Sequence, residues 1–502
     1  MRLIPGMLLA GILLLNCNAY AQKSARKQDA TALFDAYVQQ AVKDWKVPGL
    51  AIVVVKDNQV VFKKAYGTRD MSTGKPVDTQ TLFACASTTK AMTAACMGML
   101  VDQGKISWDD PVIKHLPGFK LYDPFVTREI RIRDLFLHNS GVGNADYLWA
   151  NNNLSTEEIV SRLQLIKPAY SFRAGFIYQN IFYVVAGQVI EKVSGMPWSD
   201  FITKNIFTPL GMNRTRPLLS LVTDANITRP HYLIDSTIQP IDHESADAVG
   251  AAGSVLSSID DISLWLKCML DSSKYAGGRL VKPETWKELL RPQTFVPESE
   301  FYPTQKITQP NFTTYAMGWF QQDYKGKKLN FHTGSLNGLV AIHAQIPELK
   351  TGVYIFANLD HAEIRHALMF KAFDQFALGG DRDWSKEFLA LYGERKRVAE
   401  QKAKSAADKR VLNTKPSLPL QEYAGKYSDP LYGNIELKVV NDHLEALFNQ
   451  TATGVLSHWN YDSFQLSWNK KWDGKDLVSF NLDTEGKVAE LTWGRASFKK
   501  IK

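Results

Sequence analysis

Cysteine is scarce in this sequence, which contains four in 502 residues. Cys17 lies in an N-terminal segment that we expect to be removed, which leaves Cys85, Cys96 and Cys268 in the mature chain. A sparse and odd set of cysteines does not predict a disulfide framework, even for an exported protein, so the fold must depend on its hydrophobic core. We interpret Cys85, two residues before Ser87, as a small buried apolar residue rather than as a nucleophile.

Motifs of metal, phosphate and nucleic-acid chemistry are also missing. The sequence has no His-Glu-x-x-His motif and no clustered Cys and His ligands, so we predict no metal site. It has no Gly-rich phosphate loop, and we predict no cofactor. Clusters of Arg and Lys with interleaved aromatic residues are absent, which argues against nucleic acid as a partner. Removing Arg2 from a formal net charge of +8 leaves +7. We interpret this excess as dispersed surface lysines, the alternative being attraction to anionic envelope polymers.

The first 21 residues are typical of a secretory signal peptide. They contain one positive charge at Arg2, an apolar run over residues 7–15, and small residues at the expected cleavage point, Ala21. The run is too short for a permanent membrane span, and no later stretch of about 18 residues is continuously apolar. We therefore predict a periplasmic or secreted protein without a stable membrane span. Lipidation at Cys17 is the alternative, although Asn16 before it fits lipoprotein processing poorly.

Composition and local patterns divide the rest of the chain into three segments. Residues 30–378 combine β-rich runs near both ends with helical patterns between them. This order predicts an α+β domain in which strands from the first and last thirds form one sheet flanked by helices. Residues 379–416 are rich in Ala, Lys, Arg and Glu and indicate a charged helical linker. Residues 417–502 contain short β-type runs separated by turn residues, so we predict a small all-β accessory domain there.

Ser-x-x-Lys tetrads start at five positions, namely Ser24, Ser72, Ser87, Ser467 and Ser497. The tetrad alone therefore proves nothing. Ser87 differs from the others because an extended approach precedes it and an apolar helical pattern follows it as far as Gln103. On that helix Lys90 lies one turn away on the same face as Ser87. A serine hydroxyl needs a base, and lysine serves when burial lowers its pKa, so we predict Ser87 as nucleophile and Lys90 as its base.

A Tyr-x-Asn triplet occurs twice, and its two copies differ in context. Tyr178 and Asn180 precede a helical pattern, whereas Tyr432 and Asn434 lie in the β-rich tail, where we interpret them as turn residues. We expect the ammonium of Lys90 to lower the pKa of the Tyr178 phenol, which would then relay a proton. The Asn180 amide would hold a substrate carbonyl and orient the lysine. Ordinary packing of the tyrosine, with Asn180 as a helix cap, is the alternative.

The segment His332-Thr333-Gly334-Ser335 lies just ahead of a strand pattern over residues 339–346. A strand edge with Thr and Gly lets a substrate backbone lie alongside, so we predict all four residues on the substrate side of the site. The backbone N–H of Ser335 would complete an oxyanion hole with the N–H of Ser87 at the helix start. His138 is a further histidine, which we interpret as bonding within its own turn, catalysis being the alternative.

The three motifs in this order resemble the serine β-lactamase and penicillin-binding protein superfamily. The resemblance covers about residues 30 to 378 and favours the branch of class C β-lactamases, D-aminopeptidases and related esterases. It implies a β-lactamase/transpeptidase-like antiparallel sheet flanked by helices, with a helical subdomain. It also implies that Ser87 is the acylated nucleophile, Lys90 its base or base partner, Tyr178 the proton relay and Asn180 an anchor for the substrate and the lysine. The tail resembles a β-domain often attached to such cores.

His332 departs from the pattern of the penicillin-binding relatives, which normally carry a lysine there whose charge helps to bind a substrate carboxylate. Histidine has a reference pKa of about 6.5 and is mostly neutral at pH 7. We therefore predict a peptidase- or esterase-like serine hydrolase that acts through an acyl-enzyme on amide or ester bonds. Candidate substrates are small molecules or peptides, including peptidoglycan-derived peptides and D-amino acid substrates. A true β-lactamase or D-Ala-D-Ala carboxypeptidase is one alternative, and a non-catalytic sensor or assembly protein is another.

Overall fold

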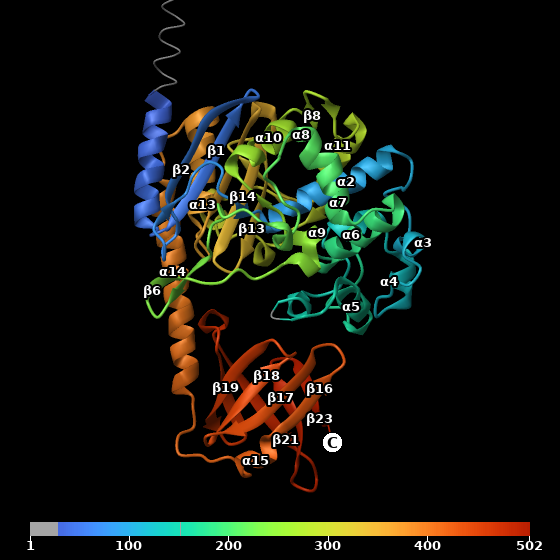
Figure 1. Ribbon diagram of the computed structural model, residues 1–502, viewed down its shortest axis with the longest axis vertical. Helices are drawn as coiled ribbons and strands as arrows, with labels where there is room; N and C mark the ends of the chain where they lie inside the picture. Colours follow the sequence, from blue (N-terminus) through green and yellow to red (C-terminus); the bar gives the residue numbers. More distant parts are fainter. Residues whose placement is uncertain (1–28, 151, 502) are drawn as a thin grey trace, which may run out of the picture.

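The computed structural model describes residues 29–150 and 152–501 (Figure 1). The expected signal peptide, residues 1–21 with Cys17, lies outside the described residues. The remainder forms a mixed body of helices and sheet and, below it in Figure 1, a barrel; helix α14 (Trp384–Asp408) runs from one to the other. Within the described ranges, no helix combines the length and apolarity that crossing a bilayer requires.

One antiparallel sheet lies at the centre of the mixed body, with the strand order β10-β11-β12-β13-β14-β15-β1-β2-β3 in the described part of the chain. Its strands are β1 (Gly49–Lys56), β2 (Gln59–Asp70), β3 (Lys75–Pro76), β10 (Thr294–Phe295), β11 (Thr313–Ala316), β12 (Trp319–Tyr324), β13 (Lys327–Leu336), β14 (Leu339–Ile346) and β15 (Thr351–Ala357). Strand β1 pairs with β15 from Leu50↔Ala357 to Lys56↔Thr351. The first and last thirds of the domain therefore meet in one sheet, which confirms the predicted α+β fold.

Helices cover both faces of this sheet, and β1 shows why its sequence is almost continuously apolar. Successive side chains of a strand point to opposite faces. Val53 and Val55 pack into the layer of α2 (Thr89–Asp102) and α10 (Ile259–Leu270). Ile52 and Val54 pack into the other layer, with the N-terminal helix over residues 29–44 and α13 (Ile364–Phe373). Both layers need apolar side chains, so β1 has no polar face.

The helical subdomain lies around α2 and α6 (Ile181–Ser194), on the right of Figure 1. The other helices are α3 (Val112–His115), α4 (Pro124–Glu129), α5 (Thr156–Ser161), α7 (Trp198–Ile202), α8 (Thr208–Leu210), α9 (Gly250–Gly253), α11 (Pro283–Leu289), α12 (Gln305–Thr308) and α15 (Leu420–Tyr423). Short paired strands are β4 (Phe83–Ala84) with β7 (Leu256–Ser257), β5 (His231–Ile234) with β6 (Thr237–Pro240), and β8 (Lys274–Tyr275) with β9 (Gly278–Arg279). The candidate active site lies where the chain leads from β4 into α2.

The C-terminal strands close into a barrel in the order β16-β17-β18-β19-β20-β21-β22-β23. They are β16 (Gly425–Asp429), β17 (Gly433–Val440), β18 (His443–Phe448), β19 (Ala452–Asn460), β20 (Ser463–Trp468), β21 (Lys475–Leu482), β22 (Val488–Trp493) and β23 (Ala496–Ile501). The first and last strands pair through Lys426↔Ile501, which leaves no open sheet edge in this domain as described. Buried aromatic side chains, including Tyr427, Phe464 and Phe480, fill the interior.

Candidate active site

Ser87 lies in a tight turn between β4 and α2. The expected helix from Ser87 to Gln103 begins slightly later, because Ala86–Thr88 form a 3₁₀ turn before α2 starts at Thr89. Ala86 has a φ of 47°, in the left-handed region that an α-helix of L-residues does not use. Ser87 remains partly exposed while Lys90 behind it is fully buried. The turn therefore presents the hydroxyl to solvent and keeps the amine dry.

Lys90 contacts three neutral oxygen atoms from three different parts of the chain. Its Nζ lies 3.0 Å from Ser87 Oγ, 2.6 Å from Asn180 Oδ1 and 2.9 Å from the carbonyl oxygen of Ala252. Burial lowers the pKa of Lys90 to about 7, although the nearby charge of Asp146 opposes this shift. An uncharged amine has two N–H groups and one lone pair. The amide and carbonyl oxygens accept the two N–H groups, so the lone pair is left for the proton of Ser87.

Tyr178 lies beside this pair, with Lys90 Nζ 5.0 Å from the centre of its ring. The ring is partly exposed, but the hydroxyl is buried and no described side chain or backbone group forms a hydrogen bond of ordinary length with it. Burial raises the pKa of Tyr178 well above its usual range, and contact with Ser87 opposes the rise only in part. The expectation of a lowered phenol pKa is therefore wrong, because burial dominates. The Tyr178 phenol is therefore neutral.

Asn180 is held from behind by a carboxylate that the sequence analysis did not single out. Asn180 Nδ2 donates to Asp146 Oδ1 at 2.8 Å, which leaves Asn180 Oδ1 facing Lys90. The indole N–H of Trp149 donates to the same carboxylate oxygen at 2.9 Å. Asp146 thus fixes the orientation of the amide and raises the pKa of Lys90 by its charge. In the sequence, Asp146 is distinguished only by its position in a polar loop between the Ser-x-x-Lys and Tyr-x-Asn motifs.

Strand β13 brings the third motif against the serine, and its four residues lie inside this strand, just ahead of β14 as expected. A Cβ added to Gly334 would lie 2.3 Å from the carbonyl oxygen of Cys85 and 3.0 Å from the backbone nitrogen of Ser87. These are backbone atoms that cannot move aside cheaply, so only glycine permits this approach. Ser335 follows as an exposed residue, and the two expected oxyanion donors, the N–H groups of Ser87 and Ser335, come from segments that touch.

Arg365 on α13 supports this end of β13. Its Nη1 donates to the carbonyl oxygen of Gly334 at 2.5 Å and to Ser335 Oγ at 2.9 Å. Glu363 forms an ion pair with the same guanidinium at 3.1 Å, so the buried charge is compensated. The neighbouring Thr333 Oγ1 lies 2.6 Å from the hydroxyl of Tyr302. These contacts hold the strand from the side opposite the serine.

His332 is buried and uncharged, with 1% of its surface exposed. Its Nδ1 lies 2.6 Å from the carbonyl oxygen of Thr333, which can only accept, so Nδ1 carries the proton. Its Nε2 then accepts from the Tyr315 hydroxyl at 2.9 Å. Burial, together with the positive charge of Lys90, lowers the pKa of His332 to about 3. The side chain therefore lies on the same face of β13 as Gly334, with its ring centre 6.0 Å from that of Tyr178, and offers no positive charge to a substrate.

His138 and Cys85 have structural surroundings. His138 Nδ1 accepts from the backbone N–H of Gln179 at 3.0 Å rather than bonding within its own turn. It therefore positions the segment between Tyr178 and Asn180, with its ring centre 4.5 Å from that of Tyr178. Cys85 is fully buried, and burial raises the pKa of its thiol to about 12, which does not suit a nucleophile.

Comparisons with known proteins agree with this geometry. The family described as Beta-lactamase matches residues 34–372, and a domain of unknown function, DUF3471, matches residues 409–502. The chain is 28% identical over 476 residues to the unguisins hydrolase ungD of Aspergillus violaceofuscus, covering 86% of this chain and 80% of that protein. It is 25% identical over 344 residues to Protein flp of Staphylococcus aureus, covering 66% and 64% respectively.

Solved structures share both the core and the extra domain. An octameric penicillin-binding protein homologue from Pyrococcus abyssi matches with a TM-score of 0.61 and 25% identity, over 93% of this chain and 99% of that one. SurE matches with a TM-score of 0.57 and 19% identity, over 95% of this chain and 100% of that one, which is a likeness of fold. The chain belongs to the beta-lactamase family of serine hydrolases and carries, after its catalytic core, an eight-stranded barrel domain.

Proposed function

We propose that this protein is an exported serine hydrolase that cleaves amide or ester bonds through an acyl-enzyme on Ser87. The observation that carries the proposal is the Lys90 amine, dry and 3.0 Å from Ser87 Oγ, with a pKa of about 7. A base with that pKa is half unprotonated near neutral pH. The signal peptide predicted for residues 1–21 supports a periplasmic or extracellular place of action.

The reaction follows from the positions of these groups. Ser87 Oγ attacks the substrate carbonyl while its proton passes to Lys90 Nζ, and the N–H groups of Ser87 and Ser335 stabilise the oxyanion. Collapse breaks the amide or ester bond, and the leaving group takes the proton from Lys90, either directly or through Tyr178. Water then attacks the ester on Ser87, gives its proton to Lys90, and releases the acid as the serine regains its proton.

The surroundings of His332 favour a peptidase or esterase over a β-lactamase. Its ring is neutral and occupied by Tyr315 and the backbone, so it cannot serve as a cationic anchor for a substrate carboxylate. The buried guanidinium of Arg365 nearby is already paired with Glu363. The unguisins hydrolase relative is, by its name, also a hydrolase, which supports hydrolysis as the reaction class for either kind of substrate.

Intact-mass spectrometry of the mature chain after exposure to a fluorophosphonate or a labelled penicillin tests the acyl-enzyme. We expect one adduct on the wild type and none on Ser87→Ala. A wild type that gains no mass, or equal labelling of the variant, would overturn the proposal in favour of a non-catalytic sensor. A panel of p-nitrophenyl esters, D-amino acid amides and nitrocefin then separates the substrate classes. Preferred turnover of nitrocefin would favour a β-lactamase over a peptidase or esterase.

A further inference from the structure

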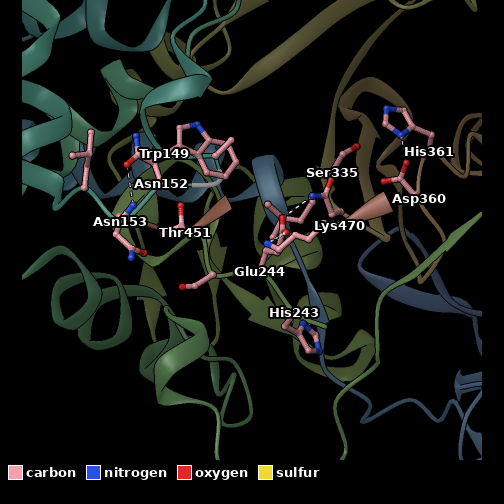
Figure 2. Close-up of a pocket in the computed structure, with 16 residues that line it drawn as sticks. Trp149, Asn152, Asn153, His243, Glu244, Ser335, Asp360, His361, Thr451 and Lys470 are labelled. Atoms are coloured by element: carbon pink, nitrogen blue, oxygen red, sulfur yellow. Dashed lines mark hydrogen bonds and ion pairs between the residues drawn. The ribbon is translucent and has the colours of Figure 1, made fainter. Parts of the chain in front are cut away.

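A cavity of about 600 Å³ lies between the catalytic core and the barrel. It begins at the active site, because Ser335, whose N–H is a proposed oxyanion donor, is part of its lining. Its polar lining includes Ser335, Asn337, Asn152 and Ser245 from the core and Thr451 and Lys470 from the barrel. Figure 2 shows Ser335, Glu244 and Lys470 grouped together, and Trp149, Asn152 and Thr451 on the other side. The barrel therefore supplies one wall of a space that opens from the catalytic strand.

Glu244 ties this wall to the catalytic strand. Its carboxylate lies 2.7 Å from Lys470 Nζ and accepts from the Asn337 side chain at 2.6 Å. Lys470 comes from the barrel, and Asn337 follows β13 directly. The indole N–H of Trp472, two residues after Lys470, lies 3.5 Å from Glu244 Oε1. The barrel is thus connected to the end of the strand that carries Gly334 and Ser335.

A second connection runs along residues 144–150. Asp146 bonds to Asn180 in the catalytic centre at 2.8 Å. The next residue, Tyr147, has its ring centre 4.6 Å from that of Tyr432 in the barrel. Ala150, exposed at the end of this segment, lines both the cavity described above and a second hollow at the barrel. The seven residues 144–150 thus connect Asp146, which holds Asn180 beside Lys90, to the barrel.

The second hollow has a volume of about 340 Å³. Its lining is mainly aromatic, whereas the first cavity is lined by many polar side chains. The aromatic lining of the second hollow is Tyr147 from the core with Tyr432, Phe448, Trp468 and Trp493 from the barrel, and the charged residues Asp473, Asp476 and Arg495 also line it. Trp468 and Trp493 pack with ring centres 5.4 Å apart, and the Trp468 indole N–H donates to Asp476 at 2.8 Å, which fixes its orientation. A concave apolar site with a few oriented polar groups is the usual form of a ligand site.

We infer that this hollow, the barrel mouth, is a substrate subsite of the hydrolase that takes a bulky apolar or aromatic side chain of a peptide. The peptide backbone would lie in the polar cavity beside Ser335, where hydroxyl and amide side chains match its N–H and C=O groups. Aromatic walls would bury the side chain. The inference rests on the proposed function and gives the barrel a role in selecting substrates.

The test uses the full-length mature chain and peptide p-nitroanilides that differ only by Phe or Ala at one position, in either configuration. We expect wild type to prefer Phe at one position by about tenfold or more in kcat/KM, as burial of an aromatic ring implies. Ala150→Trp should block the passage and Trp493→Ala should remove a wall, each reducing the preference severalfold. Hydrolysis of p-nitrophenyl acetate, which is too short to reach the barrel, should stay within twofold.

Ala407→Trp, an exposed change on α14, is the matched control and should keep the full preference. Several results would overturn the inference: no preference at any position, equal loss with peptides and with the small ester, or a preference that appears only with long-chain p-nitrophenyl esters. Labelling of Ser87 by a fluorophosphonate is independent of the barrel mouth. A wild type that cannot be labelled contradicts the proposed function, whereas a labelled enzyme without side-chain preference contradicts only the subsite.

Discussion

The core and the barrel carry the same two short motifs with different results. In the core, Ser87 and Lys90 sit three residues apart where a turn enters a helix, and their side chains lie 3.0 Å apart. In the barrel, Ser497 and Lys500 have the same spacing on strand β23, where residues three apart point to opposite faces. There Ser497 bonds to Glu490, and Lys500 donates to the carbonyl oxygen of Glu422. A spacing has chemical meaning only together with the element that carries it.

The second motif shows the same contrast. Asn180 turns its amide to Lys90 and Asp146, whereas the Asn434 backbone N–H donates to Asn449 Oδ1 at 2.7 Å. Of the two predicted turn residues, Tyr432 lies in a turn and Asn434 lies in strand β17. Gly433 beside it has a φ of 98°, which marks the bend. In the core a lysine is buried among neutral oxygens. In the barrel the interior is apolar and aromatic, and the polar residues serve the turns.

Removing the nucleophile or its base should separate the two regions most strongly. Ser87→Ala and Lys90→Met are expected to lower kcat/KM for the best ester by about 10⁴-fold or more, because nucleophile and base act as one unit. Ser497→Ala and Lys500→Met, the matched pair in the barrel, should leave it unchanged. Steady-state kinetics with a melting curve for each variant decide the matter. Comparable losses from both pairs would mean that the assignment to Ser87 is wrong.

Gly334→Ala is the next largest expected effect. The new methyl group would push β13 away from the Cys85 and Ser87 backbone, so an oxyanion donor would be misplaced and kcat should fall by about 10²- to 10³-fold. Gly454 in the barrel is the control, since a Cβ there would lie 2.8 Å from Leu466 Cδ1 and from the Ser467 carbonyl oxygen. Gly454→Ala should lower the melting temperature while fluorophosphonate labelling persists. Full activity of Gly334→Ala would show that the close approach is dispensable.

The parts of the site that were predictable are those with local causes. The contact between Ser87 and Lys90 follows from helical spacing, and the paired strands β14 and β15 follow from two apolar runs around a turn. The bond from Asn180 to Asp146 joins residues 34 apart and depends on a loop with no regular pattern. The direction of the Tyr178 pKa depends on the depth of burial, which the motif does not encode. Closure of the barrel by Lys426↔Ile501 is equally non-local.

The pH profile gives a smaller effect that tests the electrostatics of the core. Protonated Lys90 cannot accept the serine proton, so kcat/KM should rise with pH through about 7, the pKa that burial gives this amine. Asp146 raises that pKa, so Asp146→Asn should move the rising limb to lower pH. Glu422→Gln, which removes the carboxylate nearest Lys500 in the barrel, should leave the limb in place. A limb that does not move in Asp146→Asn, or that moves to higher pH, contradicts this account.

The smallest effect is expected where the two regions meet through exposed charges. Lys471 of the barrel and Asp235 of the core form an ion pair in which both side chains are more than half exposed. Solvent screens such a pair, so Lys471→Ala should change the free energy of unfolding by less than about 1 kcal/mol. Glu244→Gln, at the less exposed pair with Lys470, should have the larger effect. Calorimetric melting curves rank the two, and a larger destabilisation from Lys471→Ala would place the main anchor of the barrel at Asp235.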